Sequence, residues 1–591
     1  MGILLLVGAL GLPATFAQHS GFPVKHEKFL IGHDQSVFEP QFASAGVAAL
    51  GALTSSNGIV VGTNVRVNAQ QTGTVAGGPL TGLFGRTEDA IVSTDDGLRI
   101  VVGYNFADGF QRPPFNTVNP RPGTPGLSGF SYSRNGGQTW TDGGAVPLFT
   151  ISEGTIVTRG DPWLALGEGE RVLFANIAVD PALPASQFPL GISVHRGHFT
   201  ATGFMWDDVR LLQPQNYPQD FYDKESITMG RGNNRRFGYV TLTNFIETCG
   251  IPAFGFGQIE LWRTNNGGDN WEGPIIVSPD ISFDLNPNSP TCGQEGVEQQ
   301  ASTAAIGPGG QVYVLWERGP TDTIINGSST DVDIVVARSL NRGQTFDTPV
   351  KIATINSMGN NPPVGFNRFG LIDHPRIAVD AETGRVYVVY YGAVSPATSP
   401  PIVTCPAGTA DGTLCVGQSI ISSQVFISFS DDQGLTWSTG KALAPAVAPT
   451  GLKRFFPVVT TGENGTVAVV YQESAEVAAA APCNMSVQSS PPIRRVGAAS
   501  SMVNTFIVVS QDGGSSFSKP VRVSTVTSKW CTTTSNVRPN FGDYTGSVGV
   551  GNKVFPVWGD SRLPVPFGSG QVNPPDTFFA PITITTGVQQ P

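Results

Sequence analysis

The chain has 591 residues, of which 14% are charged, and it carries a formal net charge of −10 with a pI of about 5.2. An acidic chain without a basic patch is not expected to bind nucleic acid. Its 72 glycines and 46 prolines supply many turns, and no long amphipathic helix pattern is visible. The composition therefore favours one large all-β domain.

The chain begins with an apolar run over residues 3–10, and this segment ends in Thr15-Phe16-Ala17 before Gln18. The run is too short to span a membrane, and no later segment is long and apolar enough to do so. This pattern is typical of a signal peptide over residues 1–17. We therefore expect a secreted protein, extracellular or periplasmic, with an N-terminal extension over 18–60 and one domain over 61–591.

A pair of apolar strands around a short turn recurs along the whole chain. Each copy has alternating or continuous apolar residues on both sides of a Gly or Asp turn, which is typical of paired β-strands. Seven copies occur, at residues 90–103, 162–175, 226–241, 302–316, 375–390, 457–471 and 546–558.

A second repeat, an octapeptide turn, follows five of these strand pairs. Its third residue is Asn or Asp, its fifth is Gly and its eighth is Trp or Phe, at residues 133–140, 264–271, 339–346, 430–437 and 510–517. The third residue can bind nearby main-chain N–H groups, and the glycine accepts a positive φ. We call these five segments the repeat turns. Between the first two copies, a decayed copy is expected over 191–206.

The repeat turns resemble the Asp box, Ser-x-Asp-x-Gly-x-Thr-Trp, of sialidase-like β-propellers and bacterial-neuraminidase-repeat proteins. The resemblance covers about residues 87–584 and implies an all-β fold with a single β-propeller. Seven strand pairs, each followed by a third and a fourth strand, predict seven four-stranded blades; six is the alternative, because sialidases usually have six. After Trp558 the sequence offers only one strand, over 577–583. The N-terminal segment 61–67 is therefore expected to supply the missing outer strand and close the ring.

Charged residues concentrate where the first strand of each predicted blade begins. In a propeller of this kind these positions surround the central mouth of the top face, so unpaired charge there suggests a binding site. Salt bridges between neighbouring blades are the alternative explanation. The residues are Arg86, Glu88, Asp89, Arg159, Asp161, Asp223, Lys224, Glu225, Glu295, Glu298, Asp373, His374, Lys453, Arg454, Asp543 and Tyr544, with Glu317, Arg318, Glu473, Asp560 and Arg562 at the ends of second strands.

The resemblance also implies a set of catalytic roles. Sialidase chemistry uses a Tyr nucleophile activated by a Glu, and a carboxylic acid that protonates the leaving oxygen. By blade position these are Tyr544, Glu298 and Asp161. Three arginines hold the sugar carboxylate, because a guanidinium pairs with it in two places; the candidates are Arg159, Arg454 and Arg562.

The predicted function is therefore sialidase-like hydrolysis by a secreted exo-glycosidase acting on extracellular glycans or glycoconjugates. The family's Arg-Ile-Pro motif is not matched, because Arg376-Ile377 is not followed by Pro. Carboxylate pairs such as Asp223 and Glu298 could serve as acid and base for other glycosides. The alternative is a non-catalytic propeller that binds a glycan or a protein.

Six cysteines, an even number, fit an oxidising compartment. In a propeller with the repeat turns at the bottom, their loops lie on the top face, which suggests three pairs: Cys249–Cys292, Cys405–Cys415 and Cys483–Cys531. No Cys-x-x-Cys spacing or histidine motif predicts a metal centre. No cofactor is expected, although carboxylates in the mouth could hold Ca²⁺.

Overall fold

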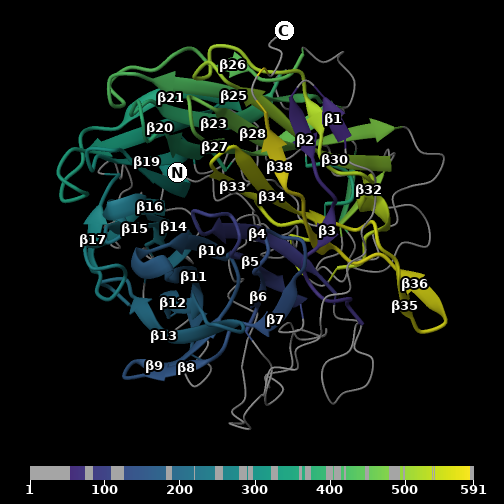
Figure 1. Cartoon of the computed structure of the whole chain (residues 1–591), viewed down its shortest axis with the longest axis horizontal. Coiled ribbons are helices and arrows are strands. Elements are labelled where there is room, and N and C mark those ends of the chain that lie inside the picture. The colour runs from purple at the N-terminus through teal and green to yellow at the C-terminus, as the bar shows by residue number, and fades with distance from the viewer. Residues whose placement is uncertain are drawn as a thin grey trace, which may run out of the picture.

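The computed structural model describes residues 54–56, 58–72, 84–107, 126–180, 190–217, 220–246, 257–278, 289, 297–320, 331–358, 362–366, 374–394, 404, 414–417, 421–445, 452–477, 493–496, 500–535, 537, 539–585 and 587. Within these residues the protein is a β-propeller. Seven antiparallel sheets follow one another round a ring, from blue through teal and green to yellow (Figure 1).

The first four sheets each contain a four-stranded meander. Their strands are β4 (Arg86–Ser93), β5 (Ile100–Phe106), β6 (Ser128–Ser133) and β7 (Thr141–Ala145); β10 (Trp163–Leu166), β11 (Val172–Val179), β12 (Gly191–Phe199) and β13 (Phe204–Leu212); β14 (Phe221–Met229), β15 (Gly238–Phe245), β16 (Gly257–Thr264) and β17 (Glu272–Ile276); and β18 (Val297–Ile306), β19 (Val312–Pro320), β20 (Asp331–Ser339) and β21 (Val350–Asn356). In the second sheet β9 (Gly154–Thr158) also pairs with β11 and carries β8 (Phe149–Ile151).

The last three sheets follow the same plan with additions. Their strands are β22 (Arg376–Val379), β23 (Val386–Ala393), β25 (Ser423–Ser430) and β26 (Lys441–Ala442); β27 (Leu452–Thr461), β28 (Val467–Val477), β30 (Ser500–Ser510), β31 (Val521–Arg522) and β32 (Ser528–Lys529); and β33 (Gly546–Val550), β34 (Lys553–Asp560), β37 (Asp576–Phe579) and β38 (Ile582–Ile584). Two small ribbons lie outside these sheets, β24 (Leu414–Gly417) with β29 (Ile493–Val496) and β35 (Val565–Phe567) with β36 (Gly570–Val572). In the part of the chain that the structure describes, the helical segments are short 3₁₀ turns at Glu168–Glu170, Gly232–Asn234 and Trp530–Thr532.

The seventh sheet combines both ends of the described chain. β3 (Val65–Arg66) pairs with β37, while β2 (Ile59–Val61) pairs with β38 and carries β1 (Thr54–Ser56). The N-terminal strands thus lie at its outer edge and begin before the predicted boundary at residue 61. The single strand predicted over 577–583 is in fact two, since Pro581 lies between β37 and β38 and has no N–H to donate.

Hydrophobic cores lie between neighbouring sheets. Along β19, Trp316 packs toward Leu261 of the third sheet, whereas Leu315 packs toward Val388 of the fifth. Successive side chains of a strand point to opposite faces, so each sheet contributes one face to each neighbouring core. All seven predicted strand pairs are present as the first two strands of the seven sheets.

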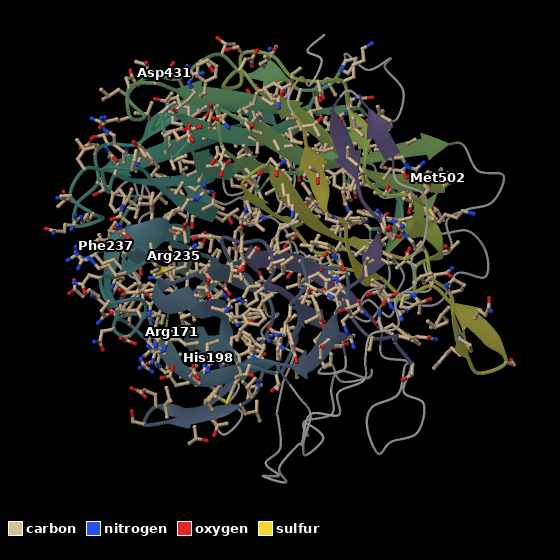
Figure 2. The ribbon with its side chains drawn as sticks, viewed as in Figure 1. Arg171, His198, Arg235, Phe237, Asp431 and Met502 are labelled. Carbon is tan, nitrogen blue, oxygen red and sulfur yellow. The ribbon has the colours of Figure 1, made fainter. Side chains whose placement is uncertain are left out.

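The repeat turns connect the third and fourth strands of five sheets. In the fifth copy, the hydroxyl of Ser510 donates to Asp512 and accepts from the N–H of Gly514, and the N–H of Ser516 donates to Asp512. The fifth-position glycines all have positive φ: Gly137, Gly268, Gly343, Gly434 and Gly514. Asp431, in the fourth copy, lies at the rim of the ring in Figure 2. The predicted decayed copy over 191–206 forms β12 and the start of β13.

Candidate functional site at the propeller axis

The innermost strands share an irregularity that aims side chains at the axis. The register of β4, β14, β18 and β27 shifts near its start, as in a β-bulge, and β9 and β10 are interrupted at the same place. A non-glycine residue at each of these points has a left-handed φ of 51–59°: Glu88, Asp161, Lys224, Ala301 and Phe456. Bulges re-aim side chains, and strained backbone of this kind gathers at functional sites.

Lys224 is the centre of a charged cluster. Its ammonium donates to carboxylate oxygens of Asp161 and Asp543, both at 2.8 Å. The side chains of Lys224 and Asp543 are 1% and 0% exposed, whereas that of Asp161 is 14% exposed. Residues of the second, third and seventh sheets therefore meet at one point, and Asp161 is the part of it nearest to solvent.

Glu88 joins this group from the first sheet. Asn105 donates to one of its oxygens at 2.5 Å, and the N–H of Asp543 donates to the other at 3.2 Å. Burial first, and then the charges of Asp161 and Asp543, raise the pKa of Glu88 well above its usual value. Glu88 therefore binds a proton more tightly than an exposed carboxyl group does.

The neighbouring negative charges have a larger effect than burial on the pKa of Lys224. Burial acts to lower the pKa of Lys224, but Asp161 and Asp543 hold this pKa well above its usual value. The two residues beside it in the chain respond mainly to burial, which raises the pKa of Asp223 to about 7 and that of Glu225 well above its usual value. One centre thus contains an ammonium group, carboxylates and proton-holding carboxyl groups.

Aromatic rings lie beside these charged groups. The ring of Tyr544 lies 5.2 Å from that of Trp163 and 5.7 Å from that of His374. The guanidinium of Arg376 lies over both aromatic rings, 4.1 Å from Trp163 and 5.1 Å from Tyr544. Burial lowers the pKa of Arg376 to about 9 and that of His374 well below its usual value, so the imidazole is neutral.

Several buried polar atoms of this region have no hydrogen-bond partner. They are both carboxyl oxygens of Glu225, both ring nitrogens of His374, Nη1 of Arg376 and Oδ2 of Asp223. Buried polar groups are nearly always paired, so such a concentration points to a bound ligand or a reaction. We call the residues Glu88, Asp161, Trp163, Asp223, Lys224, Glu225, His374, Arg376, Asp543 and Tyr544 the axial cluster.

Two of the three predicted catalytic residues lie in the axial cluster. The hydroxyl of Tyr544 donates to the main-chain oxygen of Pro162 at 3.0 Å. Burial, and then the charges of Glu88, Asp161 and Glu225, raise the pKa of Tyr544 well above its usual value. Asp161 is thus a neighbour of Tyr544, whereas Glu298 is not among the groups given as shifting this pKa.

The predicted arginines each have their own surroundings. Arg454 donates to Glu473 at 2.8 Å and to Gln424 at 2.9 Å. Arg562 has a fully buried side chain that pairs with Asp560, and its Nη1 donates to Asn64. These two guanidinium groups therefore have separate sets of partners.

The third predicted arginine, Arg159, lies between β9 and β10, two residues before Asp161, and its main-chain N–H donates to Ile177. Arg376 was not among the predicted arginines, because no proline follows Ile377 to complete the Arg-Ile-Pro motif. It is nevertheless the arginine of the axial cluster. Trp163 was also missed. The Asp-Pro-Trp and His-Pro-Arg segments at 161–163 and 374–376 share a pattern that could have pointed to both residues.

Cys531 is disulfide-bonded. Cys249, Cys292, Cys405 and Cys483 lie outside the described residues, as do Glu295, Asp373 and residues 1–17, and nothing is described of the side chain of Cys415. The three cysteine pairs therefore stay predictions. Among the described residues, no three His, Cys, Asp or Glu side chains gather to hold a metal ion, and no helix there is long and apolar enough to cross a membrane.

No protein-family model and no curated protein matches the chain. Solved structures similar in fold include an α-L-arabinofuranosidase from Fusarium graminearum, which is 12% identical and covers 70% of this chain and 92% of its own, with a TM-score of 0.38. An intramolecular trans-sialidase from Ruminococcus gnavus is 11% identical, with coverages of 68% and 92% and a TM-score of 0.35. An ulvan lyase of family PL25 is 9% identical, with coverages of 87% and 93% and a TM-score of 0.39. These comparisons assign no activity to this chain.

Proposed function

We propose that this protein is a secreted, carbohydrate-active enzyme that cleaves extracellular glycans at its axial cluster. The observation that carries the proposal is the placement of Tyr544 beside two carboxyl groups in different surroundings, those of Glu225 and Asp161. Proton-holding Glu225 has no hydrogen-bond partner, whereas Asp161 accepts a hydrogen bond from the ammonium of Lys224. Glycoside hydrolysis requires one group that donates a proton and another that accepts one.

The geometry supports a two-step hydrolysis of the sialidase type. In the first step, the oxygen of Tyr544 bonds to the anomeric carbon, its proton passes to Asp161, and the glycosidic C–O bond breaks. The leaving oxygen takes the proton of Glu225. In the second step, water attacks the anomeric carbon and gives a proton to Glu225, while Asp161 returns its proton to the released tyrosine oxygen. The sum is addition of one water to one glycosidic bond.

This scheme changes the roles expected from sequence. Asp161 becomes the base, because it pairs with Lys224, and Glu225 becomes the acid, because it keeps its proton and no hydrogen bond holds that proton. An unassisted tyrosine is a poor nucleophile, and the raised pKa of Tyr544 increases its need for a base. The hydrogen bond from the ammonium of Lys224 keeps the Asp161 carboxylate oriented.

The second candidate function is a glycan- or protein-binding propeller. The observation that favours it is the burial of the axial cluster, whose most exposed charged pair has side chains only 1% and 14% exposed. In that case Lys224 and its carboxylates join the blades rather than act on a substrate.

Turnover of fluorogenic glycosides separates the two functions. The panel contains a sialoside, neutral glycosides and uronic glycosides, and the variants are Tyr544→Phe and Glu225→Gln. We expect each substitution to lower kcat/KM at least about 100-fold. The matched control is Tyr222→Phe, because Tyr222 is another buried tyrosine, bonded to the carboxylate of Glu260 at 2.8 Å in the third sheet.

Turnover that survives both substitutions would place the reaction outside the axial cluster. Absence of turnover across the panel, with a folded wild-type protein, would favour the binding propeller.

A further inference from the structure

A group of arginines lies on the turn between the first two strands of the third sheet. This turn follows β14 and reads Gly230-Arg-Gly-Asn-Asn-Arg-Arg-Phe237, so residues 231–236 contain three arginines and no acid. Arg231 and Arg236 are exposed, and Arg235 is partly exposed. In a chain with a formal net charge of −10, this segment is locally basic.

A fourth arginine reaches the same place from the neighbouring sheet. The guanidinium carbon of Arg342, in the third repeat turn, lies 4.3 Å from the centre of the Phe237 ring, and that of Arg236 lies 4.7 Å from it. One aromatic ring therefore orients two guanidinium groups from two sheets. A guanidinium that stacks on a ring keeps its in-plane N–H donors available to an oxyanion. We call Arg231, Arg235, Arg236, Phe237 and Arg342 the arginine surface; Arg235 and Phe237 are labelled in Figure 2.

The two stacked arginines differ from other arginines of the third and fourth sheets in their partners. Three of those others each pair with a carboxylate: Arg235 with Asp95, Arg263 with Glu272 and Arg338 with Asp347. Arg236 and Arg342 are exposed, and among the residues that the structure describes neither forms an ion pair with an acid. Their positive charges are therefore available to a ligand.

The backbone at Arg342 is an independent observation. Arg342 is the fourth residue of its repeat turn, and its φ is 60°. Three of the other repeat turns have glycine at this position, with φ of 67–71°: Gly136, Gly267 and Gly513. A residue other than glycine in this conformation costs about 1–3 kcal/mol, and strain of this kind gathers at functional sites. The third turn thus has an arginine at a strained position, and this arginine is the one that lies over Phe237.

Exposed arginines without acidic partners suit a ligand that has several negative charges. A guanidinium binds an oxyanion such as a carboxylate in two places. Asn233 and Asn234, exposed in the same turn, add amide groups that bind hydroxyl groups. We propose that the arginine surface binds an acidic polysaccharide through its carboxylate or sulfate groups. The choice of a polysaccharide rests on the proposed function, whereas the charge and geometry of the surface do not.

The arginine surface is separate from the axial cluster. Lys224 lies in the first half of β14, whereas the arginine-containing turn begins directly after the last residue of that strand, Met229. The two sites therefore lie at opposite ends of one strand. A surface in this place holds a polysaccharide without taking part in the reaction, so affinity and turnover can be measured separately.

Affinity electrophoresis of the full chain measures the binding, in gels that contain polygalacturonate, dextran sulfate or neutral dextran. We expect at least one of the acidic polymers to retard the protein, less strongly at high salt, and neutral dextran to have no effect. Retardation by polygalacturonate alone would identify carboxylate as the ligand group, and retardation by dextran sulfate alone would identify sulfate. No retardation by either polymer, or binding only to double-stranded DNA or to phosphatidylserine vesicles, would overturn the proposal.

Variants decide whether the arginine surface holds the polymer. Arg236→Gln and Arg342→Gly are each expected to weaken binding at least about fivefold. Arg342→Gly should not lower the melting temperature, because glycine relieves the strain, so a loss of binding cannot be a loss of folding. The matched control is Arg134→Gln, which removes the same charge from an exposed position in the first repeat turn and should leave the affinity unchanged. Equal losses of affinity in Arg134→Gln and Arg236→Gln would overturn the proposal, because net charge alone would then explain the binding.

The variant Tyr544→Phe separates this proposal from the proposed function. It should bind the acidic polymer as tightly as the wild type does, because its substitution lies in the axial cluster. Unchanged turnover in Tyr544→Phe with retained binding would contradict the proposed function alone. Unchanged affinity in both Arg236→Gln and Arg342→Gly would contradict the present proposal alone.

Discussion

The repeat turns and the axial cluster differ in whether their polar groups have hydrogen-bond partners. In the fourth turn, Asp432 accepts from the N–H and the hydroxyl of Thr436, and Ser430 both donates to Asp432 and accepts from Gly434. In the axial cluster, buried atoms of Glu225, His374 and Arg376 have no partner. The hydrogen bonds of a repeat turn are local and stabilise its blade. At the axis several buried polar atoms have no hydrogen-bond partner, as expected of a site that acts on a ligand.

Backbone strain is also distributed differently. Left-handed residues occur in both regions, but in the turns the fifth position is always glycine, for which this conformation is not strained. At the axis the same conformation falls on Glu88, Asp161 and Lys224. Each such residue costs about 1–3 kcal/mol. Two repeat turns also contain a left-handed non-glycine residue at the fourth position, Arg342 and Gln433, so strain of this kind is concentrated at the axis but is not confined to it.

The largest expected effect comes from removing the lysine at the axis. Lys224→Met would leave Asp161 and Asp543 buried without their cation, which typically destabilises a protein by about 3–5 kcal/mol. Chemical denaturation of the variant measures this loss. A second substitution, Asp543→Asn, should restore part of the stability, because it removes one of the uncompensated charges.

Lys441→Met provides the control for this experiment. Lys441 is exposed, and its ammonium donates to the main-chain oxygen of Ser515. Removing it should change stability by less than about 0.5 kcal/mol. Similar losses of stability in the two variants would mean that Lys224 contributes no more than an exposed lysine does. The ion pairs of Lys224 would then not stabilise the axial cluster.

A smaller effect of opposite sign is expected at Glu225. Burial raises its pKa, so above the usual carboxyl pKa the unfolded chain releases a proton that the folded chain retains. Its contribution to stability is complete at low pH and is lost as pH rises toward the folded pKa. Glu225→Gln should therefore leave stability near pH 4 unchanged and raise it by about 1–3 kcal/mol at pH 8, while it abolishes turnover.

Unfolding curves at several pH values measure this difference. A Glu225→Gln variant that is less stable than the wild type at pH 8 would mean that the carboxyl group has a stabilising partner. The contrast between a satisfied periphery and an unsatisfied axis would then weaken.

The sequence predicted the periphery much better than the axis. The repeat turns are encoded within eight residues, and the paired strands by local apolar patterns, so their number and order could be predicted. The position of Asp161 and Tyr544 at one centre also followed from blade order. The pairing of Lys224 with Asp543 joins residues 319 apart and depends on how the sheets close, which no local pattern contains.

The left-handed residues explain the remaining differences. A bulge changes which side chains point to the axis. The prediction that paired Glu298 with Tyr544 used only positions counted from the start of each strand, and Glu298 lies before the bulge of β18. Arg376 was not among the predicted site residues, because its stacking over Trp163 joins the inner strands of the second and fifth sheets, which are not consecutive in the ring.

The smallest effect is expected in a single repeat turn. Ser510→Ala removes the hydroxyl that bonds Asp512 and leaves the buried N–H of Gly514 without its acceptor, a loss of about 1–2 kcal/mol. The hydrogen bonds that Asp512 accepts lower its pKa, so stability from this turn is present at neutral pH and is lost on acidification through the folded pKa. This pH dependence is opposite to that of Glu225. Thermal unfolding should therefore show Ser510→Ala to be destabilising at neutral pH, with a difference from the wild type that shrinks in acid. A difference in stability that instead grows toward low pH would contradict this prediction. It would mean that the turn, like Glu225, binds protons more tightly in the folded chain than in the unfolded chain.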